Sequence, residues 1–231
     1  MHHCIETGRA CRALIYILVF LINAFWAIGQ TDQNPPIEKL SDSVYRIGTV
    51  RLDREKREIY LSGRVNMNRG IVEVVACGPQ GKLHESIFVL DVVPHDVQVA
   101  LLLLGLDESR VQLSDDGKHL LHGDTVTIFA RWQIGQEQVS YAAEDLIATA
   151  DNQDRVSLQS WIFVGSRIID GVFQADVQQS IISTFYELDA QNCIIGGAFA
   201  REHDFSDFVA NEKILPPRKT PVEIVIQVPV K

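Results

Sequence analysis

Residues 71–86, IVEVVACGPQGKLHES, combine a strongly apolar run, a compact turn and a second run that carries several polar groups. Residues 71–77 have the β-branched and small side chains that are typical of a buried strand. The turn sequence Gly78–Gly81 has proline at the second position and glycine at the fourth, which favours a type I turn. The stretch therefore predicts a β-hairpin in which Cys77 pairs with Lys82.

This register decides which side chains share a face of the hairpin, because successive residues of a strand point to opposite sides. It places Val75 opposite His84 and Glu73 opposite Ser86. The polar face is expected to carry Glu73, Val75, Cys77, Lys82, His84 and Ser86. The apolar face is expected to carry Val72, Val74, Ala76, Leu83, Glu85 and Ile87. The polar face is the candidate functional surface, and it gives four candidate binding residues: Glu73, Lys82, His84 and Ser86. Glu85, which this register places on the apolar face, is the fifth candidate.

The segment after the hairpin predicts one helix, over about residues 94–104. Pro94 suits the first helical position, Asp96 faces the positive end of the helix dipole, and Gly105 is a typical helix stop. Because apolar side chains occur on nearly every side of this segment, we expect the helix to be buried against a sheet.

The rest of the chain predicts strands. Residues 125–133 alternate, with Val126, Ile128, Ala130 and Trp132 on one face, and the turn at Gly135 leads into a second hairpin with residues 139–142. The run WIFVGS (161–166) predicts a central strand. Residues 222–230 alternate as well, and Pro221 and Pro229 favour an edge position. The fold class is therefore α+β and mainly β, built from antiparallel hairpins with one principal buried helix, in a single domain over residues 44–231.

The amino terminus predicts a signal peptide over residues 1–29. Arg9 and Arg12 precede an apolar run, and small residues lie just before Gln30. The apolar run is about 14 residues, shorter than a membrane span. We expect cleavage near Gln30, with an uncleaved anchor as the alternative, and a flexible leader over residues 30–43. The chain is thus expected to be secreted or periplasmic, without a transmembrane span once the signal is removed.

Charge and cysteine content limit the function further. The formal charge is −9 and becomes −10 without residues 1–29, which argues against binding to nucleic acid or to anionic lipid. Cys77 and Cys193 remain after removal of the signal. They form one disulfide, two buried free thiols, or a reactive or metal-binding pair, and the sequence leaves these alternatives open.

The candidate face could support chemistry in several ways. Glu73 and His84 would be diagonal neighbours with Cβ atoms about 7–8 Å apart, and Ser86 would complete a nucleophile, base and orienting acid. However, the nucleophile turn of a serine hydrolase is missing. Glu85 would lie on the apolar face, where a carboxylate needs a partner such as Arg51 or Arg131.

His119 and His122 lie three residues apart, a spacing that could hold a metal on a helical turn. Gly117 and Gly123 disfavour a helix there, and no third ligand is evident. A solvated loop is the preferred interpretation of this segment.

The order of motifs resembles a known family. GRVNMNRGIVEVVACGPQGKLHES, followed by LLLLGL, GDTVTIFARWQIG with YAAEDLI, and WIFVGS, is similar to the YdjY-like family of exported bacterial domains over roughly residues 44–200. The resemblance implies that Glu73, Lys82, His84, Glu85 and Ser86 match the family signature, and that the protein is extracytoplasmic. It implies no activity, because the family has none assigned.

Two functional hypotheses follow. The first is an exported, envelope-associated binding or interaction domain for a protein or small-molecule ligand, without catalysis or cofactor. The alternative is a metal-dependent or acid–base enzyme that uses His84 with Glu73 or Glu85.

Overall fold

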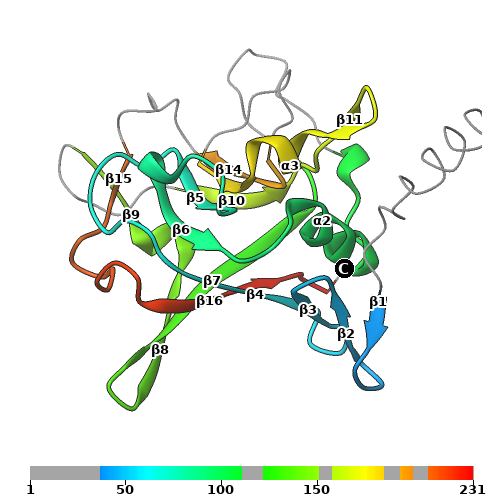
Figure 1. Cartoon of the computed structure of the whole chain (residues 1–231), viewed down its shortest axis with the longest axis horizontal. Coiled ribbons are helices and arrows are strands. Elements are labelled where there is room, and N and C mark those ends of the chain that lie inside the picture. Colours follow the sequence, from blue (N-terminus) through cyan, green and yellow to red (C-terminus); the bar gives the residue numbers. More distant parts are fainter. Residues whose placement is uncertain (1–36, 111–121, 151–157, 185–192, 200–207, 231) are drawn as a thin grey trace, which may run out of the picture. The chain divides into compact units, whose positions relative to one another are not determined.

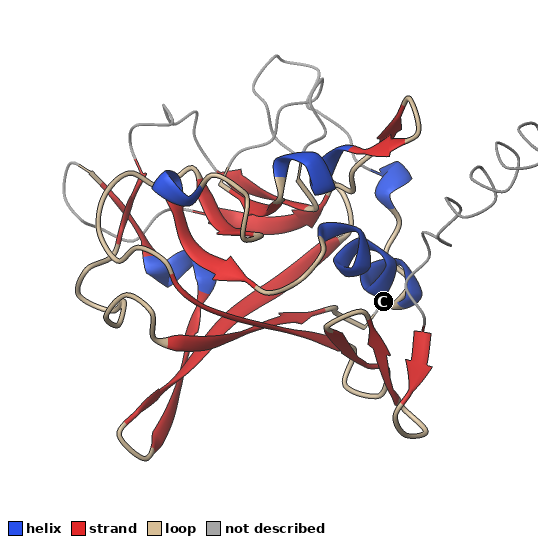
Figure 2. Ribbon diagram, in the orientation of Figure 1, coloured by secondary structure: helices blue, strands red, loops and turns tan. Residues whose placement is uncertain are grey.

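The protein is described by a computed structural model over residues 37–110, 122–150, 158–184, 193–199 and 208–230 (Figure 1). These residues belong to a compact unit that spans residues 36–231. The predicted signal peptide, residues 1–29, lies outside the described residues. The predicted fold class is confirmed, because strands dominate the described part of the chain (Figure 2).

Eight strands form a sheet that closes on itself. In chain order they are β4 (Glu58–Val65), β5 (Val74–Cys77), β6 (Ser86–Leu90), β7 (Thr125–Ile134), β10 (Leu158–Phe163), β13 (Ser180–Ser183), β14 (Ile195–Phe199) and β16 (Pro221–Gln227). Around the sheet the order is β4, β16, β7, β10, β14, β13, β5 and β6. The pairing of β6 with β4 closes the ring. Closure leaves none of these eight strands with a continuous open edge, so the ring of strands is held together by pairing on both sides.

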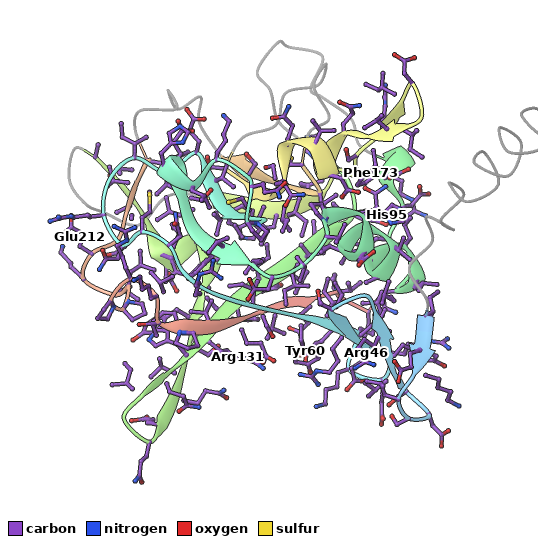
Figure 3. The ribbon with its side chains drawn as sticks, in the orientation of Figure 1. Arg46, Tyr60, His95, Arg131, Phe173 and Glu212 are labelled. Carbon is purple, nitrogen blue, oxygen red and sulfur yellow. The ribbon has the colours of Figure 1, made fainter. Side chains whose placement is uncertain are left out.

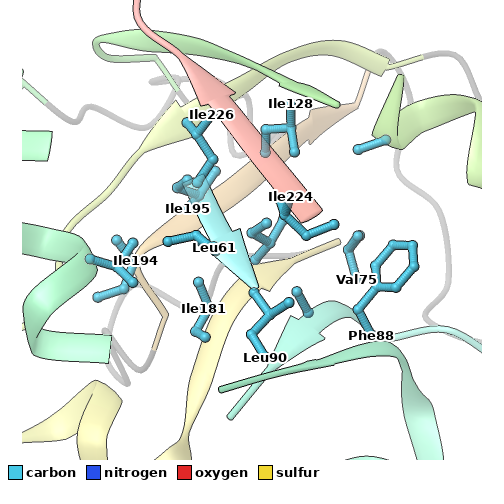
Figure 4. Close-up of a cluster of buried hydrophobic side chains, with 14 of the residues drawn as sticks. Leu61, Val75, Phe88, Leu90, Ile128, Ile181, Ile194, Ile195, Ile224 and Ile226 are labelled. Atoms are coloured by element: carbon cyan, nitrogen blue, oxygen red, sulfur yellow. The ribbon is translucent and has the colours of Figure 1, made fainter. Parts of the chain in front are cut away.

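The interior of the closed sheet is filled by apolar side chains. Alternate residues of β7 point inward, as predicted, and Ile128 and Ala130 are fully buried there. Figure 4 shows Ile128 among side chains from other strands of the ring, such as Leu61, Phe88 and Ile224. An eight-stranded closed sheet is just wide enough to be packed in this way, so its inside is the hydrophobic core.

Further strands extend the sheet from two of its members. β1 (Ile37–Lys39), β2 (Val44–Ile47) and β3 (Val50–Asp53) continue antiparallel from β4, and β8 (Glu137–Ala142) forms the predicted hairpin with β7. Two small sheets pair β9 (Ile147–Thr149) with β15 (Phe208–Ala210), and β11 (Ile168–Ile169) with β12 (Val172–Phe173). β1 lies inside the predicted leader, so ordered structure starts earlier than residue 44.

The principal helix is α2 (Pro94–Leu103), close to the predicted range. The other helical elements are α3 (Gln174–Gln178) and three short 3-10 helices, η1 (Leu83–Glu85), η2 (Glu108–Arg110) and η3 (Ala143–Leu146). α2 buries Val97 and Leu101 and packs against β2, β3 and β13, as expected for a helix buried against a sheet, while Leu102 and Leu103 on its other side are exposed. It packs beside α3, and the His95 ring meets the edge of Phe173 with centroids 5.3 Å apart (Figure 3).

Two sequence predictions about pairing are wrong. β5 and β6 are parallel, with Val74 beside Ser86, so residues 71–86 are not a hairpin. β16 lies between β4 and β7 instead of at an edge. Pro221 is compatible with this position because it is the first residue of the strand, where a missing N–H is tolerated. The direction of β5 and β6 is set by their other partners, since β5 pairs with β13 and β6 pairs with β4.

Candidate functional site

The connection between β5 and β6 folds back over the strand it leaves. The amide of Gly81 donates to the carbonyl of Gly78 (3.1 Å), and the amide of Glu85 donates to the carbonyl of Lys82 (3.2 Å). A Cβ atom at Gly81 would lie 2.8 Å from the Cβ of Cys77 and 3.1 Å from the carbonyl oxygen of Gln179. Only glycine fits this approach, which lets η1 return to the start of β5.

The backbone of Glu73 is hydrogen-bonded both to the end of η1 and to Thr184. Its amide donates to the carbonyl of Glu85 (3.2 Å). Its own carbonyl accepts from the amide of Thr184 (2.9 Å) and from the Thr184 hydroxyl (2.7 Å). Because Thr184 is almost completely buried, this network holds the backbone of Glu73 in place.

Four predicted site residues converge on this point. The Lys82 ammonium lies 2.9 Å from Oε2 of Glu73 and 3.7 Å from Oε2 of Glu85. Nε2 of His84 lies 2.8 Å from Oε1 of Glu85. Glu73, Lys82 and His84, which the sequence placed on one face, are therefore brought together, and Glu85, which the predicted register placed on the opposite face, joins them. We call these four side chains the η1 cluster.

Within the η1 cluster, the direct partners differ from those predicted. The imidazole of His84 pairs with Glu85 rather than with Glu73. Glu85 does not pair with Arg51, whose guanidinium lies over the Tyr60 ring at 3.6 Å and pairs with Glu223. The reason is the fold-back of η1, which turns Glu85 away from the core and leaves its side chain 22% exposed.

The two carboxyl groups of the cluster have pKa values shifted in opposite directions. Burial raises the pKa of Glu85 above its usual value, and the hydrogen bond with Glu73 and the Glu73 charge raise it further. Burial also acts to raise the pKa of Glu73, but hydrogen bonds with Glu85 and with Lys82 outweigh it and lower this pKa. Glu73 is thus the ionised member of the pair, and Glu85 is the member that keeps a proton to higher pH.

Ser86 does not belong to the exposed surface. Its side chain is fully buried, and its hydroxyl donates to the carbonyl of Lys82 (2.7 Å). The prediction that Ser86 shares a face with Glu73 and His84 is therefore wrong, and its hydroxyl is placed to close the turn rather than to act as a nucleophile.

Asn66 is a positioning residue that the sequence reasoning missed. Its side-chain amide donates to the carbonyl of Leu83 (2.5 Å) and to the carbonyl of Ser86 (2.8 Å). It lies just beyond the end of β4, seventeen residues from Leu83. A polar residue after a strand is common, so no local signal distinguishes this asparagine from others in the chain.

The two cysteines are free thiols in the structure, and both are buried. Cys77 is paired with Ser180, and the parallel register of β13 and β14 places Cys193 on the other side of Ser180. Two strand spacings of about 4.8 Å exceed the Cα separation that a disulfide can bridge, which is about 7 Å. Burial raises the pKa of Cys193 to about 12. Of the predicted alternatives, the structure therefore has Cys77 and Cys193 as two buried free thiols.

The described residues contain no group of three histidine, cysteine or acidic side chains arranged to hold a metal ion. His122 is exposed, whereas His119 lies outside the described residues. In the part of the chain that the structure covers, no helix has the length and apolar character needed to cross a membrane.

Comparison with known proteins agrees with the resemblance seen in the sequence. A family model described as the YdjY domain matches residues 50–227, which is more than half of the chain and includes the whole η1 cluster. Curated proteins and solved structures gave no match. This family has no assigned function. From the extent of the family match, the chain belongs to the YdjY domain family.

Proposed function

We propose that this chain is an exported, non-enzymatic binding domain of the bacterial envelope, and that the η1 cluster with Leu83 forms its contact surface. One observation carries the proposal: three titratable side chains of the loop between β5 and β6, Lys82, His84 and Glu85, meet the Glu73 carboxylate beside an exposed leucine, Leu83. His84 is 76% exposed, Lys82 is 44% exposed and Leu83 is 40% exposed. Mixed apolar and charged side chains on a rigid backbone are typical of a protein or ligand contact.

The rigidity of the surface supports recognition rather than a loose solvated turn. Asn66 holds the carbonyl of Leu83, Ser86 holds the carbonyl of Lys82, and Thr184 holds that of Glu73. A surface whose backbone is fixed in this way loses less conformational freedom when a partner binds. Export is supported by the charge, apolar run and small residues of residues 1–29.

Site-specific photo-crosslinking in the source cells tests this proposal. p-Benzoylphenylalanine is placed at Leu83 in the full chain, and at Ile134 as a matched control. Ile134 is also an exposed apolar residue, but it lies at the tip of the β7–β8 hairpin. We expect an adduct at position 83 that is recovered in the extracytoplasmic fraction and is reduced by His84→Ala. Equal labelling at both positions, or none at position 83, would exclude this contact surface.

An acid–base enzyme is the second candidate, favoured by the opposite pKa shifts of Glu73 and Glu85. A carboxyl pair with one proton can supply both a base and an acid. This candidate requires that Glu73→Gln and Glu85→Gln each abolish turnover of a substrate while the adduct at position 83 still forms. If both variants lose the adduct and no substrate is turned over by the wild type, the binding function stands alone.

A further inference from the structure

Three exposed basic side chains lie close to the η1 cluster. They are Arg69, Arg218 and Lys219. Among the described residues, none of the three has a carboxylate within ion-pair distance, whereas Arg64 is paired with Asp91 at 3.1 Å. These three cations are therefore available to a partner.

Asn66 connects the basic side chains to η1. Its carbonyl accepts a hydrogen bond from Nε of Arg218 (2.7 Å), and its side-chain amide holds Leu83. The amide of Lys219 donates to the carbonyl of the preceding residue, Val65 (2.7 Å), and Arg69 lies three residues beyond Asn66 on the same loop. Figure 1 shows the loop after β4 and the loop before β16 on the same side of the described unit as η1. We call Arg69, Lys82, Arg218 and Lys219 the basic rim.

The local charge of this surface is opposite to that of the whole chain. The chain has a formal charge of −9, whereas here the four cations of the basic rim outnumber the two carboxyl groups of the η1 cluster. Within the η1 cluster, the Glu73 carboxylate is matched by the Lys82 ammonium at 2.9 Å. The remaining cations are therefore not neutralised locally. Such a surface attracts an acidic partner to one place on a molecule that repels it elsewhere.

From this arrangement we infer that the partner of the η1 surface is an acidic polypeptide segment that also carries apolar side chains. The inference rests on the proposed function and adds the class of partner. Acidic side chains of the segment pair with Arg69, Arg218 and Lys219, and an apolar side chain contacts Leu83. An anionic lipid surface fits less well, because the carboxyl groups of Glu73 and Glu85 lie beside Lys82 of the rim and the chain as a whole is strongly acidic.

The test uses the full chain with the crosslinker at Leu83 and compares two charge-reversed variants. Arg69→Glu/Lys219→Glu changes the rim. Arg54→Glu/Lys56→Glu makes the same change in net charge on the turn between β3 and β4, at the other end of β4. The eight residues of β4 separate the two places by about 23 Å. We expect the rim variant to lower the adduct yield about tenfold and the control variant to leave it unchanged.

Two further arms identify the partner's chemistry. An excess of a soluble peptide of glutamate and leucine should suppress the adduct, and one of lysine and leucine should not. Phosphatidylglycerol vesicles should not bind the wild-type chain, and binding that is lost in the rim variant would replace the inference with a lipid surface. An adduct with a second copy of this chain would overturn the inference unless the cross-linked residue lies in an acidic segment.

The outcomes separate this inference from the function on which it rests. If the adduct at position 83 forms equally well in the rim variant and in the presence of the acidic peptide, the binding function stands and an acidic partner is excluded. No adduct at position 83 in any form removes the contact surface itself.

Discussion

The pKa values of Glu73 and Glu85 are shifted in opposite directions, so the stabilising contributions of the two carboxyl groups depend on pH with opposite signs. The pKa of Glu85 is raised from about 4.5, so its contribution is present below about pH 4.5 and is lost as the pH rises through the folded pKa. The pKa of Glu73 is lowered, so its contribution is present above about pH 4.5 and is lost as the pH falls through the folded pKa. The pair is best satisfied between these two folded pKa values, where it holds one proton.

The substitution Glu85→Gln tests this assignment. Glutamine keeps the shape and the hydrogen-bond donor of a protonated glutamate but cannot lose a proton. We expect the free energy of unfolding to change by less than about 1 kcal/mol near pH 4 and to lose the decline that the wild type shows above pH 4.5. Urea unfolding from about pH 4 to pH 8 measures both quantities. A variant whose pH dependence matches that of the wild type would contradict the raised pKa of Glu85.

Glu73→Gln is the matched comparison at the ionised member of the pair. This change removes the ion pair with Lys82 at 2.9 Å, while the longer contact of Lys82 with Glu85 at 3.7 Å remains. Because both side chains are partly exposed, the expected loss near pH 7 is about 1 kcal/mol or less. The loss should shrink as the pH is lowered, since the wild-type Glu73 then becomes protonated.

At the scale of a single element, η1 is a helix of three residues that cannot be stable alone. It is held from outside by Asn66, which donates to the carbonyls of Leu83 and Ser86. The whole η1 cluster depends on this anchor, because Lys82, His84 and Glu85 all belong to the segment that Asn66 holds down.

The substitution Asn66→Asp should release η1. The aspartate has the same shape but donates no hydrogen bond, and its charge faces two carbonyl oxygens. We expect a loss of about 1–3 kcal/mol in the free energy of unfolding and faster amide exchange at Leu83 and Glu85. Asn68→Asp makes the same chemical change two residues along the loop and should leave both amides protected. Unchanged exchange in Asn66→Asp would show that η1 is held by other contacts.

Some helices and strands of this fold were predictable from the sequence, and the pairing of others was not. The helix at Pro94 and the β7–β8 hairpin were predictable because their signals are local: a proline and an acid at the helix start, and strict alternation about a tight turn. The direction of β6 relative to β5 was not predictable from the sequence, because a Gly-Pro-Gln-Gly turn permits both a hairpin and a tighter fold-back. The choice is made by the strands that flank the pair, β13 from a distant part of the chain beside β5, and β4 beside β6.

The candidate site was partly predictable for a related reason. Any fold-back at Gly78–Gly81 directs residues 82–85 back along the strand that follows Glu73, so their general proximity to Glu73 is predictable, but a hairpin would place Glu85 on the opposite face. Which atoms meet depends on whether residues 82–85 form a strand or a helix. Helical geometry turns Glu85 toward Glu73 and buries Ser86, and the contributions of Asn66 and Thr184 come from separate strands.

At the scale of the whole molecule, the closed sheet depends on one seam, between β4 and β6. Gly63 lies opposite Leu90 at this seam. A Cβ atom at position 63 would lie 2.4 Å from the carbonyl oxygen of Val89 and 2.9 Å from the Cα of Leu90. These are backbone atoms that cannot rotate away, so the close pairing that completes the ring requires glycine at this position.

Gly63→Ala should therefore weaken the seam and, through it, the functional surface. Since β6 begins at Ser86, directly after η1, any displacement of β6 also moves the residues that hold the η1 cluster. We expect the free energy of unfolding to fall by about 1–3 kcal/mol or more, as in other overpacked sites. Amide exchange should rise at Asp91, whose N–H donates to the carbonyl of Ser62 across the seam (2.9 Å). Ser62→Ala, an exposed change next to Gly63, is the control and should alter neither quantity. If Gly63→Ala is as stable as the wild type and Asp91 stays protected, the ring does not depend on close approach at this seam.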